Sequence, residues 1–340
     1  MDLSIRVLKP EEKVDKMGSN EEVYLKGTVV IKRTKSEKRM WKTVKDTFKT
    51  NHMFMVTFVL FVIVNISVFV LAAIFPNWEK MYKDTPEFFA LIQQNVCHPL
   101  GTCAPTVEHP LGTTYLSYDN LICLINAAKN SLIIGYGAAA ISVPIAVFVG
   151  IIGGYKGGTL DNFFSMITNV VLVLPIISIY MFIAANVGAQ DTPIVILLIG
   201  LLTWPWAARS IRSQVLSLKE REFVNMARVT GTGSVSIALK EIMPNMLSYI
   251  LLVFAMETAI GIGTEAGLTI IGVAEPSGIT LGMMLQWSLN QSFVANAVTR
   301  PDIYSVLWLS PGIVLLIIIM IIYLLQASMP QIFNPRLREK

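Results

Sequence analysis

The chain has 340 residues, of which 54% are hydrophobic and only 15% charged, and its mean hydropathy is +0.59. The apolar share lies above and the charged share below those of soluble domains, which excludes a water-soluble globular protein. The net charge of +4 and the pI near 8.8 do not indicate nucleic-acid binding, because the basic residues follow the membrane topology derived below.

The apolar residues gather in six blocks, each comparable to the roughly 20 residues that a helix needs to cross the hydrocarbon core. Because lipid offers no partner for free backbone N–H and C=O groups, each block is predicted to be a helix. The fourth block is short and is interrupted by Trp204, Pro205 and Trp206. The blocks cover residues 53–75, 121–152, 163–187, 193–208, 246–273 and 306–327.

The lysines and arginines lie mainly on one side of these spans. Of the 27, 13 precede the first block and six lie between the fourth and fifth, whereas three lie in the opposite loops. Positive residues accumulate on the cytoplasmic side, and an even number of spans places both termini there. The sequence therefore predicts an all-α integral membrane protein with six transmembrane helices and cytoplasmic termini. No cleaved signal peptide is expected before the first span.

Four segments are predicted along the chain. Residues 1–50 form a cytoplasmic arm, in which Trp41, Val44 and Phe48 recur at helical spacing among lysines. This pattern indicates either a helix lying on the anionic inner leaflet or positive charge that only sets the topology. The first transmembrane helix and an outward loop (51–120), a permease core (121–330) and a cytoplasmic tail (331–340) follow.

The outward loop between the first two blocks contains a short repeat. His-Pro-Leu-Gly-Thr occurs at 98–102 and again at 109–113, and Cys97 and Cys103 flank the first copy. On the outer face of a membrane these cysteines form either a small disulfide loop or two free thiols, while Cys123 is expected to be packed at the membrane edge. The histidines and cysteines show no cluster at metal-ligand spacing, so no metal site is predicted.

A long cytoplasmic connection, residues 207–245, separates the fourth and fifth blocks and reads as helix, glycine turn, helix and proline. It resembles the coupling loop of permease subunits in ATP-binding-cassette importers, whose pattern is E-A-A, three residues, G, nine residues and I-x-L-P. The interval of 13 residues between glycine and proline is kept, although the first two letters differ. The E-A-A, glycine and proline positions are held by Asn225, Met226, Ala227, Gly231 and Pro244.

The resemblance implies a role for each part of this connection. Phe223, Ala227 and Gly231 would contact an ATPase subunit, and the charged Glu222 and Arg228 would set the register. Gly231 permits a turn with positive φ, and a short helix before it can dock in a groove of a soluble partner. The alternative is an amphipathic surface helix that binds nothing.

Further stretches resemble the second, C-type permease of the oligopeptide, dipeptide and nickel subfamily, from about residue 109 to the C-terminus. One difference lies on the outer side, where residues 114–119 read Thr-Tyr-Leu-Ser-Tyr-Asp instead of D-x-x-G-R-D, so the receptor or substrate is expected to be unusual. The similar stretches are His-Pro-Leu-Gly-Thr (109–113), Ala-Lys-Asn-Ser-Leu (128–132), the glycine-rich turn at 153–161, Glu-Ala-Gly-Leu-Thr-Ile-Ile-Gly (265–272) and Asn-Pro-Arg-Leu-Arg (334–338).

This resemblance implies the type I importer transmembrane fold in a prokaryotic plasma membrane. It also implies a heterodimer with a homologous permease, two cytoplasmic ATPase subunits and an extracellular or periplasmic solute-binding protein. The sequence holds no G-x-x-x-x-G-K-[S/T] phosphate loop, so the chain is expected not to be an enzyme, and the partner subunits would bind ATP and Mg. The implied solutes are oligopeptides or dipeptides. Oligosaccharides remain open, because the aromatic and amide groups expected near Trp287 suit sugars as well as peptides.

Two acidic residues fall inside the fifth block. A charged side chain costs at least about 2.5 kcal/mol at the centre of a membrane helix, so each is expected to have a cavity or a partner. Glu257 is predicted either to serve a cavity or gate in the translocation path or to pair with a basic side chain such as Lys129. Glu265, near the same face, is predicted to bind backbone at a helix break. Together with Glu257 and Lys129 it is also a candidate for the translocation path or gate.

Two other classes of membrane protein are disfavoured. A secondary transporter commonly shows repeated halves, which this sequence lacks, and the long glycine-hinged connection would then have no purpose. An intramembrane hydrolase needs facing catalytic groups, and the predicted spans contain no such pair.

Overall fold

The computed structural model describes residues 52–76, 102–114, 116–187, 191–274, 276–290, 296, 298 and 300–328. The predicted cytoplasmic arm at 1–50 and the tail at 331–340 lie outside these residues, as does Cys97.

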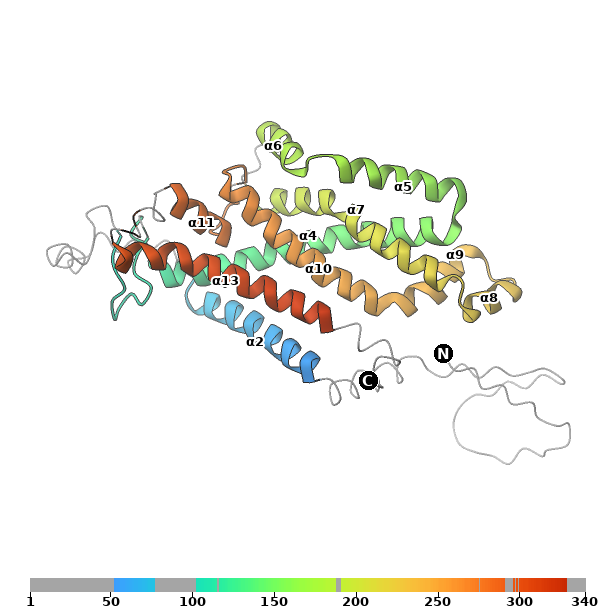
Figure 1. Cartoon of the computed structure of the whole chain (residues 1–340), viewed down its shortest axis with the longest axis horizontal. Helices are drawn as coiled ribbons and strands as arrows, with labels where there is room; N and C mark the ends of the chain where they lie inside the picture. Colours follow the sequence, from blue (N-terminus) through green and yellow to red (C-terminus); the bar gives the residue numbers. More distant parts are fainter. Residues whose placement is uncertain are drawn as a thin grey trace, which may run out of the picture. The chain divides into compact units, whose positions relative to one another are not determined.

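Helices make up the described part of the chain almost completely. Five of them are long and apolar enough to cross a membrane, and a bent pair adds a sixth when it is counted as one span. The prediction of an all-α membrane protein with six spans is confirmed. The elements are α2 (His52–Ile74), α4 (Asn120–Lys156), α5 (Gly158–Val173), α6 (Ile176–Val187), α7 (Thr192–Leu218), α8 (Glu222–Val229), α9 (Ser234–Ile237), the π-helix η1 (Ala238–Ile242), α10 (Met243–Ile270), α11 (Leu281–Asn290) and α13 (Pro301–Ser328) (Figure 1).

Two spans differ from the sequence prediction. The block at 163–187 is not one helix, because α5 ends before Leu174 and α6 continues at an angle of 82°. Pro175 lacks an N–H, and the residue before a proline disfavours the helical conformation, which accounts for the break. The fourth span is longer than predicted, since α7 runs for 27 residues through Pro205. Pro205 is buried, and membrane helices tolerate proline where neighbouring helices surround it.

The core is formed by α4, which packs most extensively against α7 and α10. Glycines permit this close approach. A β-carbon at Gly200 of α7 would lie 2.9 Å from the carbonyl oxygen of Ala138 in α4, and one at Gly135 would lie 2.9 Å from the carbonyl oxygen of Thr258 in α10. Small residues at helix interfaces are a general means of packing membrane helices, and here they bring three backbones together.

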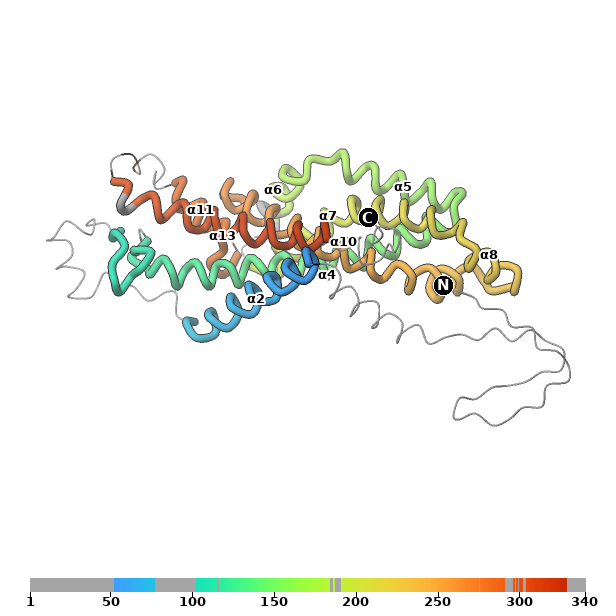
Figure 2. Tube along the Cα trace, turned by 60° about the horizontal axis from the view of Figure 1, so that its bottom comes forward, coloured from blue at the N-terminus to red at the C-terminus, as the bar shows by residue number. Residues whose placement is uncertain are grey.

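The remaining spans lie around this core. α2 packs on α13 and α4, and α5 lies on the other side of the core, against α4 and α7 (Figure 2). The hydroxyls of Thr57, near the start of α2, and Ser328, at the end of α13, are 3.2 Å apart. The first and last spans therefore have their terminal ends on the same side, in agreement with the predicted cytoplasmic termini.

Candidate functional site: the cytoplasmic connector and the buried carboxylates

The predicted coupling connection at 207–245 is more helical than a loop. α7 extends to Leu218, and α9, η1 and α10 form one continuous helical stretch from Ser234. Only residues 219–221 and 230–233 lie outside helices, on either side of α8. The short α8 is thus connected by short segments to two long membrane helices.

Gly231 ends α8 with a Schellman motif. The N–H of Thr232 donates to the carbonyl of Ala227 at 3.1 Å, and the N–H of Gly231 donates to that of Arg228 at 3.0 Å. Gly231 has a φ of +76°, a conformation that disfavours any residue with a side chain. The sequence prediction of a glycine turn at this position is therefore matched by the backbone geometry.

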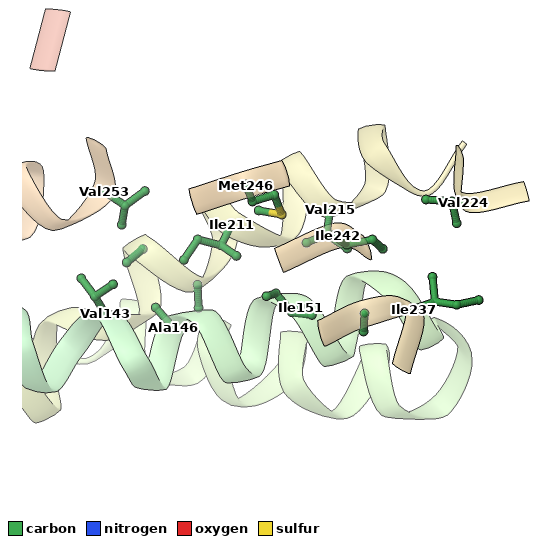
Figure 3. Close-up of a cluster of buried hydrophobic side chains, with 13 residues drawn as sticks. Val143, Ala146, Ile151, Ile211, Val215, Val224, Ile237, Ile242, Met246 and Val253 are labelled. Atoms are coloured by element: carbon green, nitrogen blue, oxygen red, sulfur yellow. The ribbon is translucent and has the colours of Figure 1, made fainter. Parts of the chain in front are cut away.

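Val224 anchors α8 to the rest of the molecule. Its side chain is fully buried in an apolar cluster with Val215 of α7, Ile151 of α4, and Ile237 and Ile242 of the segment leading into α10 (Figure 3). Phe223 and Ala227 are partly buried against the same cluster. Both residues are implied by the resemblance to face an ATPase, and the structure places part of each against this chain's own core.

The opposite face of α8 is exposed. The guanidinium of Arg228 lies 5.6 Å from the centre of the Tyr155 ring, a cation–π contact with the end of α4, and donates to Asn225 at 3.3 Å. Pro244, in the first turn of α10, is also exposed. The exposed residues of α8 are Glu222, Asn225, Met226, Arg228 and Val229.

The connection also carries exposed apolar side chains that the sequence analysis did not identify. Val229 is 86% exposed, and Val235 and Leu239 in the following segment are 59% and 53% exposed. In the sequence these residues are visible only as apolar positions within a mainly polar cytoplasmic connection. Their helical spacing alone does not assign them to one face. Together with Met226 they make the tip of the connector suitable for contact with another protein.

Glu257 lies where α10, α4 and α7 meet. Its side chain is 2% exposed and accepts hydrogen bonds from Ser142 of α4, at 2.8 Å, and from Thr203 of α7. Ser142 and Lys129 are 13 residues apart on α4, roughly 20 Å along the axis, so the predicted alternative of a pair between Glu257 and Lys129 does not form. The cavity or gating role of Glu257 stays a prediction.

Glu265 is completely buried and accepts hydrogen bonds from three hydroxyls. Thr280 donates at 2.7 Å, Thr269 at 3.0 Å and Ser131 of α4 at 3.3 Å. These partners are side-chain hydroxyls and not the backbone groups that the sequence predicts for Glu265; Ser131 in turn accepts from the N–H of Leu281 at 3.1 Å. Glu265 thus fixes the start of α11 to α4 and α10 through hydroxyl groups.

The outer segment before α4 is folded around a capping residue. Asp119 Oδ1 accepts from the N–H groups of Leu121 and Ile122 at 2.8 and 3.0 Å, and its other oxygen lies 2.5 Å from His109 Nδ1. Cys103 is disulfide-bonded. Because its predicted partner Cys97 lies outside the described residues, the pairing of these two residues stays a prediction.

Within the part of the chain that the structure describes, no group of three or more metal-ligating side chains is arranged to hold an ion. The features that stand out are instead a bundle of membrane spans and a connecting segment with exposed apolar residues. They define a multi-pass membrane protein, and the family match places it in the type I importer permease fold.

Comparison with known proteins gives the family. The chain belongs to the binding-protein-dependent transport system inner membrane components, whose family model matches residues 146–339. These are permease components of transporters rather than enzymes, so the chain is the permease of an ATP-binding-cassette importer in a prokaryotic inner membrane.

Several relatives are named oligopeptide transport system permease protein OppC. The protein of this name from Mycobacterium tuberculosis H37Rv is 32% identical over 219 residues, which are 64% of this chain and 72% of the relative. That from Lactococcus lactis subsp. cremoris SK11 is 24% identical over 306 residues, covering 90% of this chain and 98% of the relative. The similarity to the second relative extends well beyond the region matched by the family model.

Proposed function

We propose that this chain is one of two permease subunits of an ATP-driven, binding-protein-dependent importer of oligopeptides or dipeptides. A homologous permease completes the translocation path, a solute-binding protein delivers the solute from outside, and two cytoplasmic ATPase subunits bind ATP and Mg. α8 is the element through which the ATPase subunits move this chain.

The proposed coupling to the ATPase subunits rests on the geometry of α8. One face is locked by Val224 into the cluster that joins α4, α7 and η1, while the other presents Met226 and Val229 outward. An exposed short helix with apolar residues is suited to a groove on a soluble partner. Because α8 is joined to α7 by three residues and to α10 through α9 and η1, a displacement of α8 is passed to two spans.

Peptides are favoured as the solute by the names of the relatives, which are oligopeptide permeases in species as different as Mycobacterium tuberculosis and Lactococcus lactis. The substrate is tested by uptake of labelled peptides of increasing length beside an oligosaccharide panel, using the complete complex in proteoliposomes. Uptake of oligosaccharides but not peptides would replace the peptide assignment while leaving the permease assignment intact.

The coupling role is tested by Met226→Glu in the complex reconstituted in nanodiscs. Glutamate has a high helix propensity, so α8 is expected to stay folded while its exposed apolar contact is lost. We expect ATP hydrolysis stimulated by the binding protein to fall about tenfold, the effect of losing roughly 1.4 kcal/mol at an interface.

Val107→Glu is the matched control, because Val107 is 100% exposed in the outer segment and its replacement adds the same charge far from α8. It is expected to keep the stimulated ATPase activity, provided that the binding protein still docks, which is measured separately. If Met226→Glu assembles and is stimulated like the unmodified chain, α8 does not form the ATPase contact and the proposal fails.

A further inference from the structure

The bent span formed by α5 and α6 is held to the core in an unusual way. Of the residues of α5, all of which the structure describes, Thr168 alone is buried. Apolar burial therefore does little to fix the position of this helix. Its aromatic contact with α4 is an edge-to-face pair between Phe164 and Phe148, with ring centres 6.4 Å apart.

The covalent connection from α4 gives little positional information either. Gly157 and Gly158 both have positive φ values, +68° and +62°, and a β-carbon at either position would meet nothing within 4 Å. Glycine can adopt more backbone conformations than other residues, although here the N–H of Gly157 donates to the carbonyl of Gly153 and its own carbonyl accepts from the N–H of Asp161. The orientation of α5 therefore also depends on contacts beyond its link to α4.

Two polar contacts with α7 supply those constraints. Arg212 makes a bidentate ion pair with Asp161, in which its Nε and one terminal nitrogen each lie 2.6 Å from a carboxylate oxygen. One turn earlier on α7, Arg209 donates to the side-chain oxygen of Asn169 at 2.8 Å. The donors are three residues apart on α7 and the acceptors eight apart on α5, so each pair shares one helix face. Bidentate arginine–carboxylate pairs fix geometry as well as distance.

Two glycines of α4 leave room for the ion pair between Asp161 and Arg212. A β-carbon at Gly153 of α4 would lie 3.3 Å from a carboxylate oxygen of Asp161, and one at Gly154 would lie 3.1 Å from the backbone carbonyl oxygen of Arg212. The Asp161 side chain is 14% exposed and the Arg212 side chain 35% exposed, so water screens the pair in part. Asp161 also lies in the first turn of α5, where a negative charge is favourable.

The outer part of the bent span is attached to α7 as well. The Tyr180 side chain of α6 is fully buried in an apolar cluster that contains Val195 and Ile199 of α7. The bent span is therefore attached to the core on both sides of the break at Pro175, through α5 to α7 and through Tyr180 of α6 to a cluster that includes residues of α7. A displacement of α7 along its axis is expected to carry α5 and α6 with it.

We propose that Arg212 and Asp161 are positioning residues for transport, which link the bent span α5–α6 to α7 and so to the ATPase-contacting helix α8. The inference rests on the proposed function, because it needs α8 to receive a movement. Neither residue contacts the ATPase or the solute in this role. Their task is to make the third span follow the fourth.

The first experiment compares uptake per ATP hydrolysed in the complete complex for Asp161→Asn, Arg212→Gln and the charge exchange Asp161→Arg with Arg212→Asp. The single variants are expected to assemble and keep stimulated ATPase activity, while uptake per ATP falls about tenfold, within the usual range of coupling effects. The exchange is expected to recover most of the uptake. Recovery distinguishes the ion pair from a general loss of folding. Asn169→Ala, which removes the neutral contact, is the milder control.

The second measurement follows the two helices directly. Nitroxide labels are placed at Asn162 of α5 and Ser213 of α7, both of which are exposed. In the unmodified complex the distance between the labels is expected to be the same with and without ATP, and to change between these states in Asp161→Asn. A change of about one helical turn, 5.4 Å, in the unmodified complex would show that α5 does not follow α7.

These outcomes separate the two proposals. If the unmodified complex shows no stimulated ATPase activity, the proposed function fails before the ion pair is tested. If it is stimulated and transports, but Asp161→Asn transports equally well per ATP or the charge exchange recovers nothing, the linking role of Arg212 and Asp161 is overturned alone.

Discussion

The two ends of the helical stretch formed by η1 and α10 differ in the polar contacts that accompany their apolar packing. At the cytoplasmic end, Ile242 of η1 and Met246 of α10 lie in an apolar cluster with α4, α7 and α8. At the outer end, Ile262 and Leu268 lie in apolar clusters as well, and Glu265 also binds the hydroxyls of Ser131, Thr269 and Thr280. The outer end thus adds a buried hydrogen-bond network to the apolar packing.

The difference matters for movement. Apolar burial depends on the area removed from water and little on direction, so packed helices can shift by small amounts without losing it. Hydrogen bonds weaken steeply when their angles and distances change. We therefore expect the cytoplasmic end of the core to adjust when α8 is displaced, while the network around Glu265 keeps the outer end and α11 in register.

The largest expected effect comes from breaking the cytoplasmic cluster. Ile242→Ala removes a fully buried side chain, and the free energy of unfolding is expected to fall by about 3 kcal/mol. It is measured by unfolding in mixed micelles titrated with denaturing detergent. Leu239→Ala is the control in the same π-helix, because Leu239 is 53% exposed. Equal losses for both variants would contradict a role for the cluster at this end.

The outer end is tested by Glu265→Leu. Three buried hydroxyls lose their acceptor, and the free energy of unfolding is expected to fall by about 2 kcal/mol. Glu265→Gln keeps a carbonyl acceptor of similar shape and is expected to lose less. A glutamine variant as unstable as the leucine variant would show that the hydroxyl network is not what stabilises this end. The same unfolding titration measures both.

A smaller effect is expected midway along α10. Ser142→Ala removes one of the hydroxyls that donate to Glu257 and is expected to lower the free energy of unfolding by about 1 kcal/mol. Ser213→Ala on the exposed face of α7 is the control and is expected to change nothing measurable. A null result for Ser142→Ala would mean that the remaining hydroxyl of Thr203 satisfies Glu257 alone.

The smallest effect on stability is expected at the exposed face of α8. Arg228→Gln removes the cation–π contact with Tyr155, for which a loss of about 0.5 kcal/mol is expected at an exposed site. Thermal unfolding monitored by tryptophan fluorescence measures it, with Glu222→Gln as the control on the same helix. A loss several times larger would show that Arg228 has a structural role beyond this contact.

The sequence predicts the spans well because the length of an apolar run is a direct measure of what a membrane requires. It does less well at the prolines inside the apolar blocks. Pro175 breaks a span, whereas Pro144, Pro205 and Pro311 lie inside continuous helices. Pro205 is buried and Pro144 is exposed, so burial alone does not decide the outcome. The local pattern does not distinguish these positions either.

The candidate site could be predicted only where it depends on local chemistry. The glycine turn at Gly231 follows from local backbone chemistry and is visible as a spacing. The partners of Glu265 could not be predicted in this way, because Ser131 lies 134 residues away along the chain and Thr280 lies beyond the end of α10. Hydroxyl residues are common in membrane helices, and nothing in their sequence positions singles out the ones that meet a carboxylate.

The π-helix η1 sets the angular position of the connector. A π-helix closes its hydrogen bonds one residue later than an α-helix, so η1 contains an additional residue without a break between α9 and α10. In an α-helix each residue turns the chain by about 100°, the angle that follows from 3.6 residues per turn. Deleting one residue from Ala238–Ile242 would therefore rotate the exposed Val235 by that angle relative to α10. The angular position of the connecting segment relative to the fifth span thus depends on a single added residue.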